Sequence, residues 1–158
     1  MKYCFDTSAL IDLGERRYPE SVKAFGSIWE QLYQGVDKGE IVSSHDVKRE
    51  LEEKAGEWRA KFIQHCGKMF LIDEGIEGQY SVLIREIEAN PSFRVNKHRE
   101  RFFSGADPWI IAVARSVGES TVVSSETKSL TDYGLGTICK SLSVEHISLL
   151  DYLKAAGI

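Results

Sequence analysis

The sequence predicts an α/β fold in which helices cover both faces of a mostly parallel central sheet, giving three layers. Short β-prone runs alternate along the chain with longer segments of helical periodicity, as repeated units of strand, helix and strand require. The length of 158 residues suits one compact core, because domains cluster near about 100 to 150 residues. We therefore expect a single domain that spans residues 1–158.

Five short runs rich in β-branched and other apolar residues are expected to form the strands. They are residues 2–5, 41–44, 69–72, 121–125 and 143–146. The run 121–125 opens with Thr121 and two valines and is typical of a buried strand. Most of these runs are separated by a segment with apolar residues at helical spacing, which favours parallel strands joined by helices.

The helices are expected where apolar positions recur at helical spacing. They are residues 7–13, 21–33, 45–62, 80–89, 107–117 and 148–156. Gly35 is expected to end the second of these helices, and Gly56 to kink the third. Residues 134–138 are predicted to form turns, and residues 92–104 a loop or a helix at the mouth of a site. In the helix 107–117, which is apolar on most faces and should be buried, Asp107 suits the N-cap and Pro108 the first helical position.

The composition excludes several classes of protein. The net charge of −4 means that the chain as a whole does not attract phosphate backbones as a basic binding module does, so any nucleic-acid contact must be local or bridged by metal cations. No apolar run is long enough to span a bilayer, and Asp6 interrupts the N-terminus before a signal-peptide core forms, which predicts a cytoplasmic protein without a membrane partner. Cys4, Cys66 and Cys139 form no CxxC pair and are expected to be buried thiols.

Four acidic residues follow predicted strands or begin predicted helices at one edge of the sheet. Asp6 ends the first strand, and Glu50 lies in the helix after the second. Asp107 opens the buried helix, and Glu126 follows the strand 121–125. Because ligands of parallel α/β sheets bind outside the carboxyl ends of the strands, these acids can converge in space.

Converging carboxylates repel one another, and a divalent cation is their natural partner. Mg²⁺ or Mn²⁺ fits, since both are hard ions that prefer oxygen ligands and keep coordinated waters. Such an ion lowers the pKa of a bound water and stabilises charge that develops on phosphoryl oxygens. The nucleophile is then water, and no nucleophilic side chain is needed.

Four segments carry a family resemblance. They are YCFDTSALI (residues 3–11), VKREL (47–51), GADPWIIAVA (105–114) and TVVSSE (121–126). Their order and spacing resemble those of PIN domains, and the chain looks like a PIN-domain ribonuclease of the VapC-like toxin type, in a DUF4411-like subgroup. The resemblance covers nearly the whole chain. It implies a PIN-like sandwich and a Mg²⁺- or Mn²⁺-dependent endoribonuclease that hydrolyses RNA phosphodiester bonds. It also implies a toxin–antitoxin pair with a protein antitoxin, and a homodimer.

Carried over residue by residue, the resemblance makes Asp6, Glu50 and Asp107 the core catalytic acids, which bind one or two metal ions. Glu126 stands at the fourth acidic position, where Asp is commoner in the family, and Asp132 lies close enough in sequence to compete for that role.

Three hydroxyl residues are assigned supporting roles by the same resemblance. Thr7 and Ser8 look like groups that orient Asp6 or hydrogen-bond a metal-bound water. Ser124 stands where the family has a threonine or serine beside the fourth acid.

Each acid also has a simpler structural interpretation. Asp6 can cap the helix that follows it, and Glu50 can form a surface pair with Lys54, one helical turn away. Glu126 can be a solvated loop acid. Asp46 shares a helix face with Glu50, but an acid at the start of a helix is the better explanation for it.

The segment 92–104 combines cations with aromatic rings. The cations considered for substrate binding are Arg94, Lys97, Arg99 and Arg101, and the rings are Phe93, Phe102 and Phe103. This mixture suits single-stranded RNA, with phosphates on the cations and bases on the rings. The alternative, which we favour, is a solvated helix whose phenylalanines pack inward.

Two other functions compete with the nuclease. A catalytically inactive PIN-like scaffold that binds RNA or a partner protein is disfavoured because all the main acidic positions are filled. A phosphohydrolase of the haloacid-dehalogenase type needs a second acid two residues after the first, and here Thr7 and Ser8 follow Asp6.

Overall fold

The centre of the molecule is a five-stranded parallel sheet, seen in a computed structural model that describes residues 1–54, 56–125 and 132–158. The strands are β1 (Lys2–Phe5), β2 (Ile41–Ser44), β3 (Phe70–Leu71), β4 (Ser120–Ser124) and β5 (Glu145–Ser148). Their order is β3-β2-β1-β4-β5, and every neighbouring pair is parallel. The predicted α/β class with a parallel sheet is confirmed.

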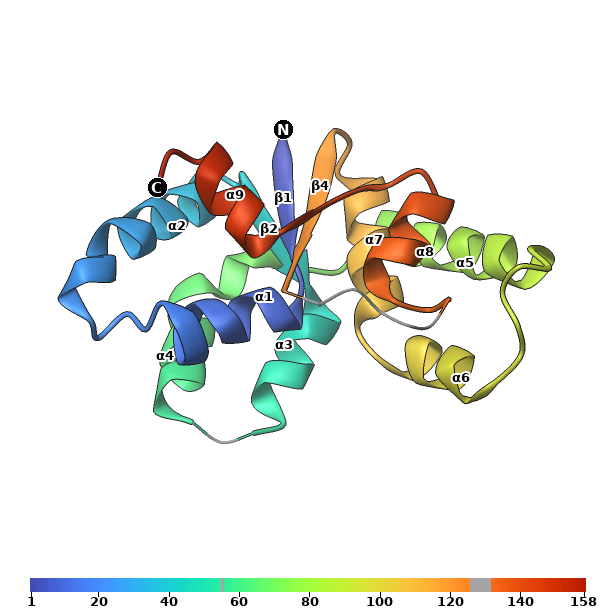
Figure 1. The fold of residues 1–158 in the computed structure, drawn as a ribbon, viewed down its shortest axis with the longest axis horizontal. Coiled ribbons are helices and arrows are strands. Elements are labelled where there is room, and N and C mark those ends of the chain that lie inside the picture. The colour runs from blue at the N-terminus through green and yellow to red at the C-terminus, as the bar shows by residue number, and fades with distance from the viewer. Residues whose placement is uncertain (55, 126–131) are drawn as a thin grey trace.

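Helices cover both faces of this sheet (Figure 1). They are α1 (Thr7–Ile11), α2 (Gly26–Asp37), α3 (His45–Glu52), α4 (Glu57–Cys66), α5 (Glu74–Ala89), α6 (Lys97–Ser104), α7 (Asp107–Ser116), α8 (Leu135–Ser141) and α9 (Leu149–Ala155). In Figure 1, α1, α2, α4 and α9 lie to the left of the sheet, and α5, α7 and α8 to the right. The three layers predicted from the alternation of elements are confirmed. Of the described helices, none has the length and apolar character to cross a membrane.

The strands divide their side chains between two apolar cores, because successive residues of a strand point to opposite faces. Phe5 and Val123 belong to the core under α1, α2, α4 and α9. Cys4 and Val122 belong to the core under α5, α7 and α8. Burial raises the pKa of the Cys4 thiol to about 12. Cys4, like the other two cysteines, is buried as expected.

Helix α7 is central, as its apolar sequence predicts. Ile110, Ile111 and Val113 are fully buried, and the helix packs against α5 and against β1, β2 and β4. This helix fixes the position of its own first residue, Asp107, relative to the sheet.

The start of α7 differs from the prediction by one residue. Asp107 is the first helical residue, and Ala106 is the N-cap, without a side-chain capping bond. The predicted N-cap role of Asp107 is therefore wrong. The physical reason is that the N–H of Ala106 donates a hydrogen bond to Glu50, which holds the chain just before the helix.

Two glycines act differently from what the sequence suggests. Gly35 lies inside α2 instead of ending it. A Cβ at this position would lie 2.6 Å from Cδ1 of Ile41, so the glycine permits close packing of α2 on β2. Gly56, instead of kinking one long helix, is the N-cap of α4 with an extended backbone, and α3 and α4 are separate helices.

Other boundaries shift for local reasons. Helix α5 begins at Glu74, because the side chain of Asp73 caps it. It therefore starts before the expected helix at residues 80–89 and includes Gly75 and Gly78. Helix α2 begins only at Gly26, after a 3₁₀ turn at Lys23–Phe25. The prediction of turns at residues 134–138 is wrong, because Gly134 is the N-cap of α8 and residues 135–138 lie within that helix.

The chain reverses its direction across the sheet between β1 and β4. Strands β2 and β3 lie on one side of β1, and β4 and β5 on the other. In open α/β sheets, ligands bind outside the carboxyl ends of the strands at such a switch point. The carboxyl ends of β1 and β4 lie at the lower edge of the sheet in Figure 1, and we call this the carboxyl edge.

Candidate functional site

Asp6 lies at the switch point, directly after β1, and is 3% exposed. Its Oδ1 accepts a hydrogen bond of 2.9 Å from the N–H of Ala9, so it caps α1 as the simpler interpretation holds. The hydroxyl of Ser8 lies 2.8 Å from Oδ1 and 3.0 Å from Oδ2, where it donates to the carboxylate. These donors fix the orientation of the Asp6 carboxylate, as predicted for Ser8.

Ser8 also connects the end of β1 to the end of β4. Its Oγ accepts a hydrogen bond of 3.0 Å from the N–H of Ser125, which follows β4. The hydroxyl oxygen of Ser125 is itself buried and has no hydrogen-bond partner in the part of the chain that the structure describes. A buried polar atom without a partner is costly, and such an atom at a switch point indicates a place where a ligand can bond.

Glu50 connects the end of β1 to the start of α7. Its Oε2 accepts a hydrogen bond of 2.6 Å from the hydroxyl of Thr7, and its Oε1 accepts one of 2.9 Å from the N–H of Ala106. Glu50 therefore points into the protein, and the alternative of a surface pair with Lys54 is wrong. Thr7, expected to orient Asp6 or to hydrogen-bond a metal-bound water, donates to Glu50.

The two partners of Glu50 are the chain neighbours of the other predicted acids. Thr7 follows Asp6, and Ala106 precedes the half-buried Asp107. Asp6, Glu50 and Asp107 therefore come from three distant segments to the same edge of the sheet. The fourth predicted acid, Glu126, lies outside the described residues, and its competitor Asp132 is exposed.

The carboxylates at this edge are oxygen donors of the type that a hard cation prefers. Among residues 1–54, 56–125 and 132–158, no three His, Cys, Asp or Glu side chains are arranged as a metal site. The oxygens of Asp6 and Glu50 accept hydrogen bonds from neighbouring side chains and backbone N–H groups. The buried hydroxyl of Ser125 adds one more oxygen. Asp6, Glu50 and Asp107 thus bring carboxylate oxygens to one edge of the sheet, and carboxylate oxygens are the donor type that Mg²⁺ and Mn²⁺ prefer.

Asp46 lies one turn before Glu50 on α3 and pairs with Arg49 at 3.6 Å. Burial raises the pKa of the Asp46 carboxyl, and the charge of Glu50 adds to the rise, whereas Arg49 and His45 oppose it. An acid in the first turn of a helix is the interpretation that we favoured from the sequence, and the pairing with Arg49 agrees with it.

Ser124 has a partner that sequence reasoning missed. Its Oγ lies 2.7 Å from Nε2 of His146. Ser124 ends β4 and His146 lies in β5, where it pairs in register with Val122. Nothing in the local sequence marks His146, and only the knowledge that β4 and β5 are neighbours would have placed it beside Ser124.

The aromatic rings of the segment 92–104 pack inward. Phe93 and Phe102 are buried and lie against the ring of Tyr133. Arg99 lies 5.4 Å from the ring centre of Phe103, and 3.7 Å separates it from a carboxylate oxygen of Glu88. The interpretation that we favoured, a helix whose phenylalanines pack inward, is confirmed. The other three cations, Arg94, Lys97 and Arg101, are exposed.

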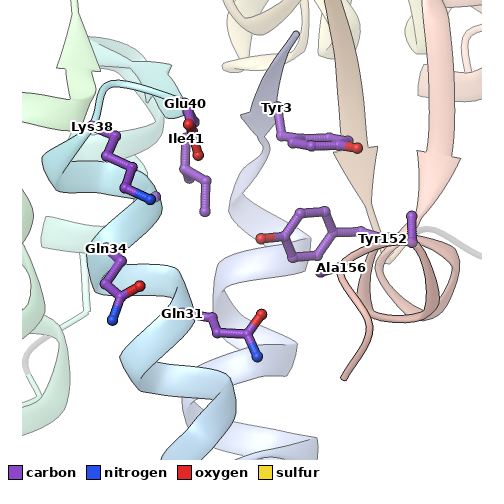
Figure 2. A pocket seen from close by; sticks show the side chains of 10 residues that line it. Tyr3, Gln31, Gln34, Lys38, Glu40, Ile41, Tyr152 and Ala156 are labelled. Carbon is purple, nitrogen blue, oxygen red and sulfur yellow. The ribbon is translucent and has the colours of Figure 1, made fainter.

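A pocket lies at the opposite, amino edge of the sheet (Figure 2). Its volume is about 290 Å³. Its lining comes from α2, α9 and the starts of β1 and β2, and comprises Tyr3, Gln31, Gln34, Gly35, Lys38, Glu40, Ile41, Tyr152, Ala155 and Ala156. None of the predicted acids lines it, so the cavity and the acids occupy different edges.

The fold and the polar carboxyl edge define an α/β sandwich with a candidate site at its switch point. The chain belongs to the family described as "Domain of unknown function (DUF4411)", which matches residues 3–158. No curated protein and no solved structure matches the chain. The family description assigns no activity, so the function must be argued from the site.

Proposed function

We propose that the chain is a metal-dependent endoribonuclease that hydrolyses RNA phosphodiester bonds at the carboxyl edge. Asp6, Glu50 and Asp107 would bind Mg²⁺ or Mn²⁺, with Glu126 as the fourth acid. The observation that carries the proposal is the pair of hydrogen bonds from Thr7 and Ala106 to Glu50, since these join the chain beside Asp6 to the chain beside Asp107.

The residues of this chain would orient the reacting groups. Ser8 and the N–H of Ala9 hold the Asp6 carboxylate, and Thr7 holds Glu50. Ser8 also accepts a hydrogen bond from the N–H of Ser125, which ties the chain after β4 to the Asp6 carboxylate. A bound divalent cation supplies the rest, by lowering the pKa of a coordinated water and stabilising charge on the phosphate oxygens.

The biological role follows from the resemblance to PIN-domain toxins. On this basis we propose that the chain is the cytoplasmic toxin of a toxin–antitoxin pair. A protein antitoxin would restrain it, and it would assemble as a homodimer. Cleavage of cellular RNA would then arrest growth.

The test compares RNA cleavage by the wild-type protein with cleavage by Asp6→Asn and Asp107→Asn. We expect Mg²⁺- or Mn²⁺-dependent cleavage of single-stranded RNA by the wild type, and a loss of ~100-fold or more in each variant, because each removes a charged oxygen ligand. Asp37→Asn, at the exposed end of α2, is the matched control and should cleave normally. Cleavage by all three variants at the wild-type rate would refute the proposal.

A second candidate is a scaffold that has the same fold but binds RNA or a partner protein without catalysis. The observation that favours it is that the described residues hold no three-ligand metal group. Expression of the chain alone in bacteria separates the two. Growth arrest that both Asp6→Asn and Asp107→Asn relieve supports the nuclease, and growth that is the same with all three proteins supports the scaffold.

A further inference from the structure

The chain that leads to Asp107 is basic, although the protein as a whole is acidic. Helix α6 (Lys97–Ser104) ends three residues before Asp107, and Ala106 between them is bonded to Glu50. Residues 92–104 contain four basic residues and one acid, Glu100, whereas the whole chain has a net charge of −4. In Figure 1, α6 lies at the lower right, on the side of the carboxyl edge.

Three of the four cations are available for binding. Arg94, Lys97 and Arg101 are exposed, and none of them forms an ion pair with a carboxylate of the described residues. Lys97 and Arg101 are four residues apart, so they stand on the same face of α6, about one helical turn from each other. Arg99 differs, because its side chain is only 15% exposed and pairs with Glu88.

The backbone that carries these cations is held in place. The side chain of Asn96 caps α6 by accepting hydrogen bonds from the N–H groups of His98 and Arg99. The hydroxyl of Tyr133 donates a hydrogen bond to the carbonyl oxygen of Arg94. The cations therefore extend from an ordered base that has the inward-facing phenylalanine rings beneath it.

The burial of those rings limits what the surface can recognise. Phe93 and Phe102 are 7% and 4% exposed, so they offer no face for a base to stack on. Recognition of single-stranded nucleic acid by sequence depends on stacking and on hydrogen bonds to base edges, whereas cations contact the phosphates that every nucleotide shares.

We propose that Arg94, Lys97 and Arg101, here called the α6 strip, bind the phosphate backbone of single-stranded RNA without reading its bases and guide it to the carboxyl edge. The inference rests on the proposed function, which it extends by naming how the substrate is held. An acidic protein partner is the competing occupant of the same surface.

The test measures how RNA binding depends on salt. Each phosphate contact with a single strand contributes about −0.7 to the slope of log K against log salt concentration. Labelled oligouridine and oligoadenine of equal length are titrated with protein in EDTA, which prevents metal-dependent cleavage, between about 50 and 200 mM salt. For the triple variant Arg94→Ala, Lys97→Ala, Arg101→Ala we expect the slope to become shallower by about 2.

The matched control removes the same charge elsewhere. Lys23→Ala, Lys38→Ala and Lys154→Ala together delete three exposed cations outside α6, and the slope should stay within about 0.5 of that of the wild type. Oligouridine and oligoadenine should bind within about twofold of each other. Circular dichroism and thermal unfolding establish that both triple variants are folded. If the strip variant is not folded, Lys97→Gln alone replaces it, with a slope change of about 0.7.

Several results would overturn the proposal. They are no RNA binding by the wild type, equal slopes for the wild type and the strip variant, a strong preference for one base, or tighter binding of polyglutamate than of either oligonucleotide. Failure of the nuclease proposal is distinguishable. If the proteins show the expected slopes but the wild type never cleaves RNA with Mg²⁺ or Mn²⁺, the nuclease proposal is refuted and the α6 strip proposal stands. If the wild type cleaves RNA but the strip variant has the wild-type slope, the strip proposal is refuted and the nuclease proposal stands.

Discussion

The two edges of the sheet differ in how their polar groups are held. At the carboxyl edge, side chains from α1 and α3 bond to one another and to the backbone after β4 and before α7. At the amino edge, the pocket of about 290 Å³ is lined by glutamines, tyrosines and a lysine from α2, α9 and the strand starts. A described pocket lies at the amino edge, whereas the hydrogen bonds between distant segments converge at the carboxyl edge.

The candidate site is therefore marked by these hydrogen bonds and by the topology of the sheet, and not by the pocket at the amino edge. Parallel strands deliver their following residues to one edge, so Asp6 and Ser125 are neighbours by topology and not by sequence. The pocket at the other edge arises where α2 and α9 diverge over β1 and β2 (Figure 2). If this comparison is right, substitutions at the two edges have different consequences.

The largest difference is expected between Glu50→Gln and Glu40→Gln. Glu50→Gln removes a charge and replaces one carboxylate oxygen with an NH₂ group. Either Thr7 or the N–H of Ala106 then loses its hydrogen-bond acceptor. We expect RNA cleavage to fall by about 100-fold, because a ligand is lost, and the free energy of unfolding to fall by about 1 to 3 kcal/mol. Glu40→Gln at the pocket should leave cleavage unchanged. Initial rates and urea unfolding measure both effects, and equal cleavage by the two variants would contradict the comparison.

An intermediate effect is expected for Ser8→Ala. The hydroxyl of Ser8 donates to Asp6 and accepts from the N–H of Ser125, so its loss frees the carboxylate to rotate. Supporting groups of this kind typically contribute about 10- to 100-fold in metal affinity or activity, and we expect about a tenfold loss of cleavage. Gln34→Ala in the pocket is the control. Full activity of Ser8→Ala would mean that the orientation of Asp6 does not matter.

The smallest effect is expected at Tyr152, which lines the pocket. Burial raises the pKa of its phenol to about 12, with Tyr3 and Glu40 adding to the rise. The folded state thus favours the protonated phenol, so stability is retained below the ordinary pKa of 10 and is lost as the pH rises from 10 to 12. Tyr152→Phe should lose less stability than the wild type over that interval and should cleave RNA normally. If the free energies of unfolding of the two proteins fell equally with pH over this interval, the raised pKa of Tyr152 would be contradicted.

Much of the fold could be predicted from the sequence because its strands and helices differ in periodicity. The runs 2–5 and 41–44 matched β1 and β2, and the apolar helix after Asp107 is buried as expected. Some errors fall where distant segments meet and others at local caps. Gly35 lies in a helix that packs closely on Ile41, Ala106 bonds to Glu50, and Asp73 caps α5.

The candidate site was predictable in part for the same reason. Asp6 and Asp107 could be placed because each adjoins an element with a clear sequence pattern. That Glu50 receives two hydrogen bonds across the fold, and that Ser124 contacts His146, depends on the strand order and on side-chain directions. No local pattern in a single sequence reveals the strand order or the side-chain directions.

The most direct test of the shared cation is a titration of Mn²⁺, followed by electron paramagnetic resonance of the unbound ion, with wild-type protein and with Asp6→Asn and Asp107→Asn. We predict that the wild type binds Mn²⁺ and that each substitution weakens binding by at least about tenfold, since in the proposed site two acids from different segments share one ion. A wild-type protein that leaves Mn²⁺ free in solution, or variants that bind it as tightly as the wild type, would contradict a common metal site.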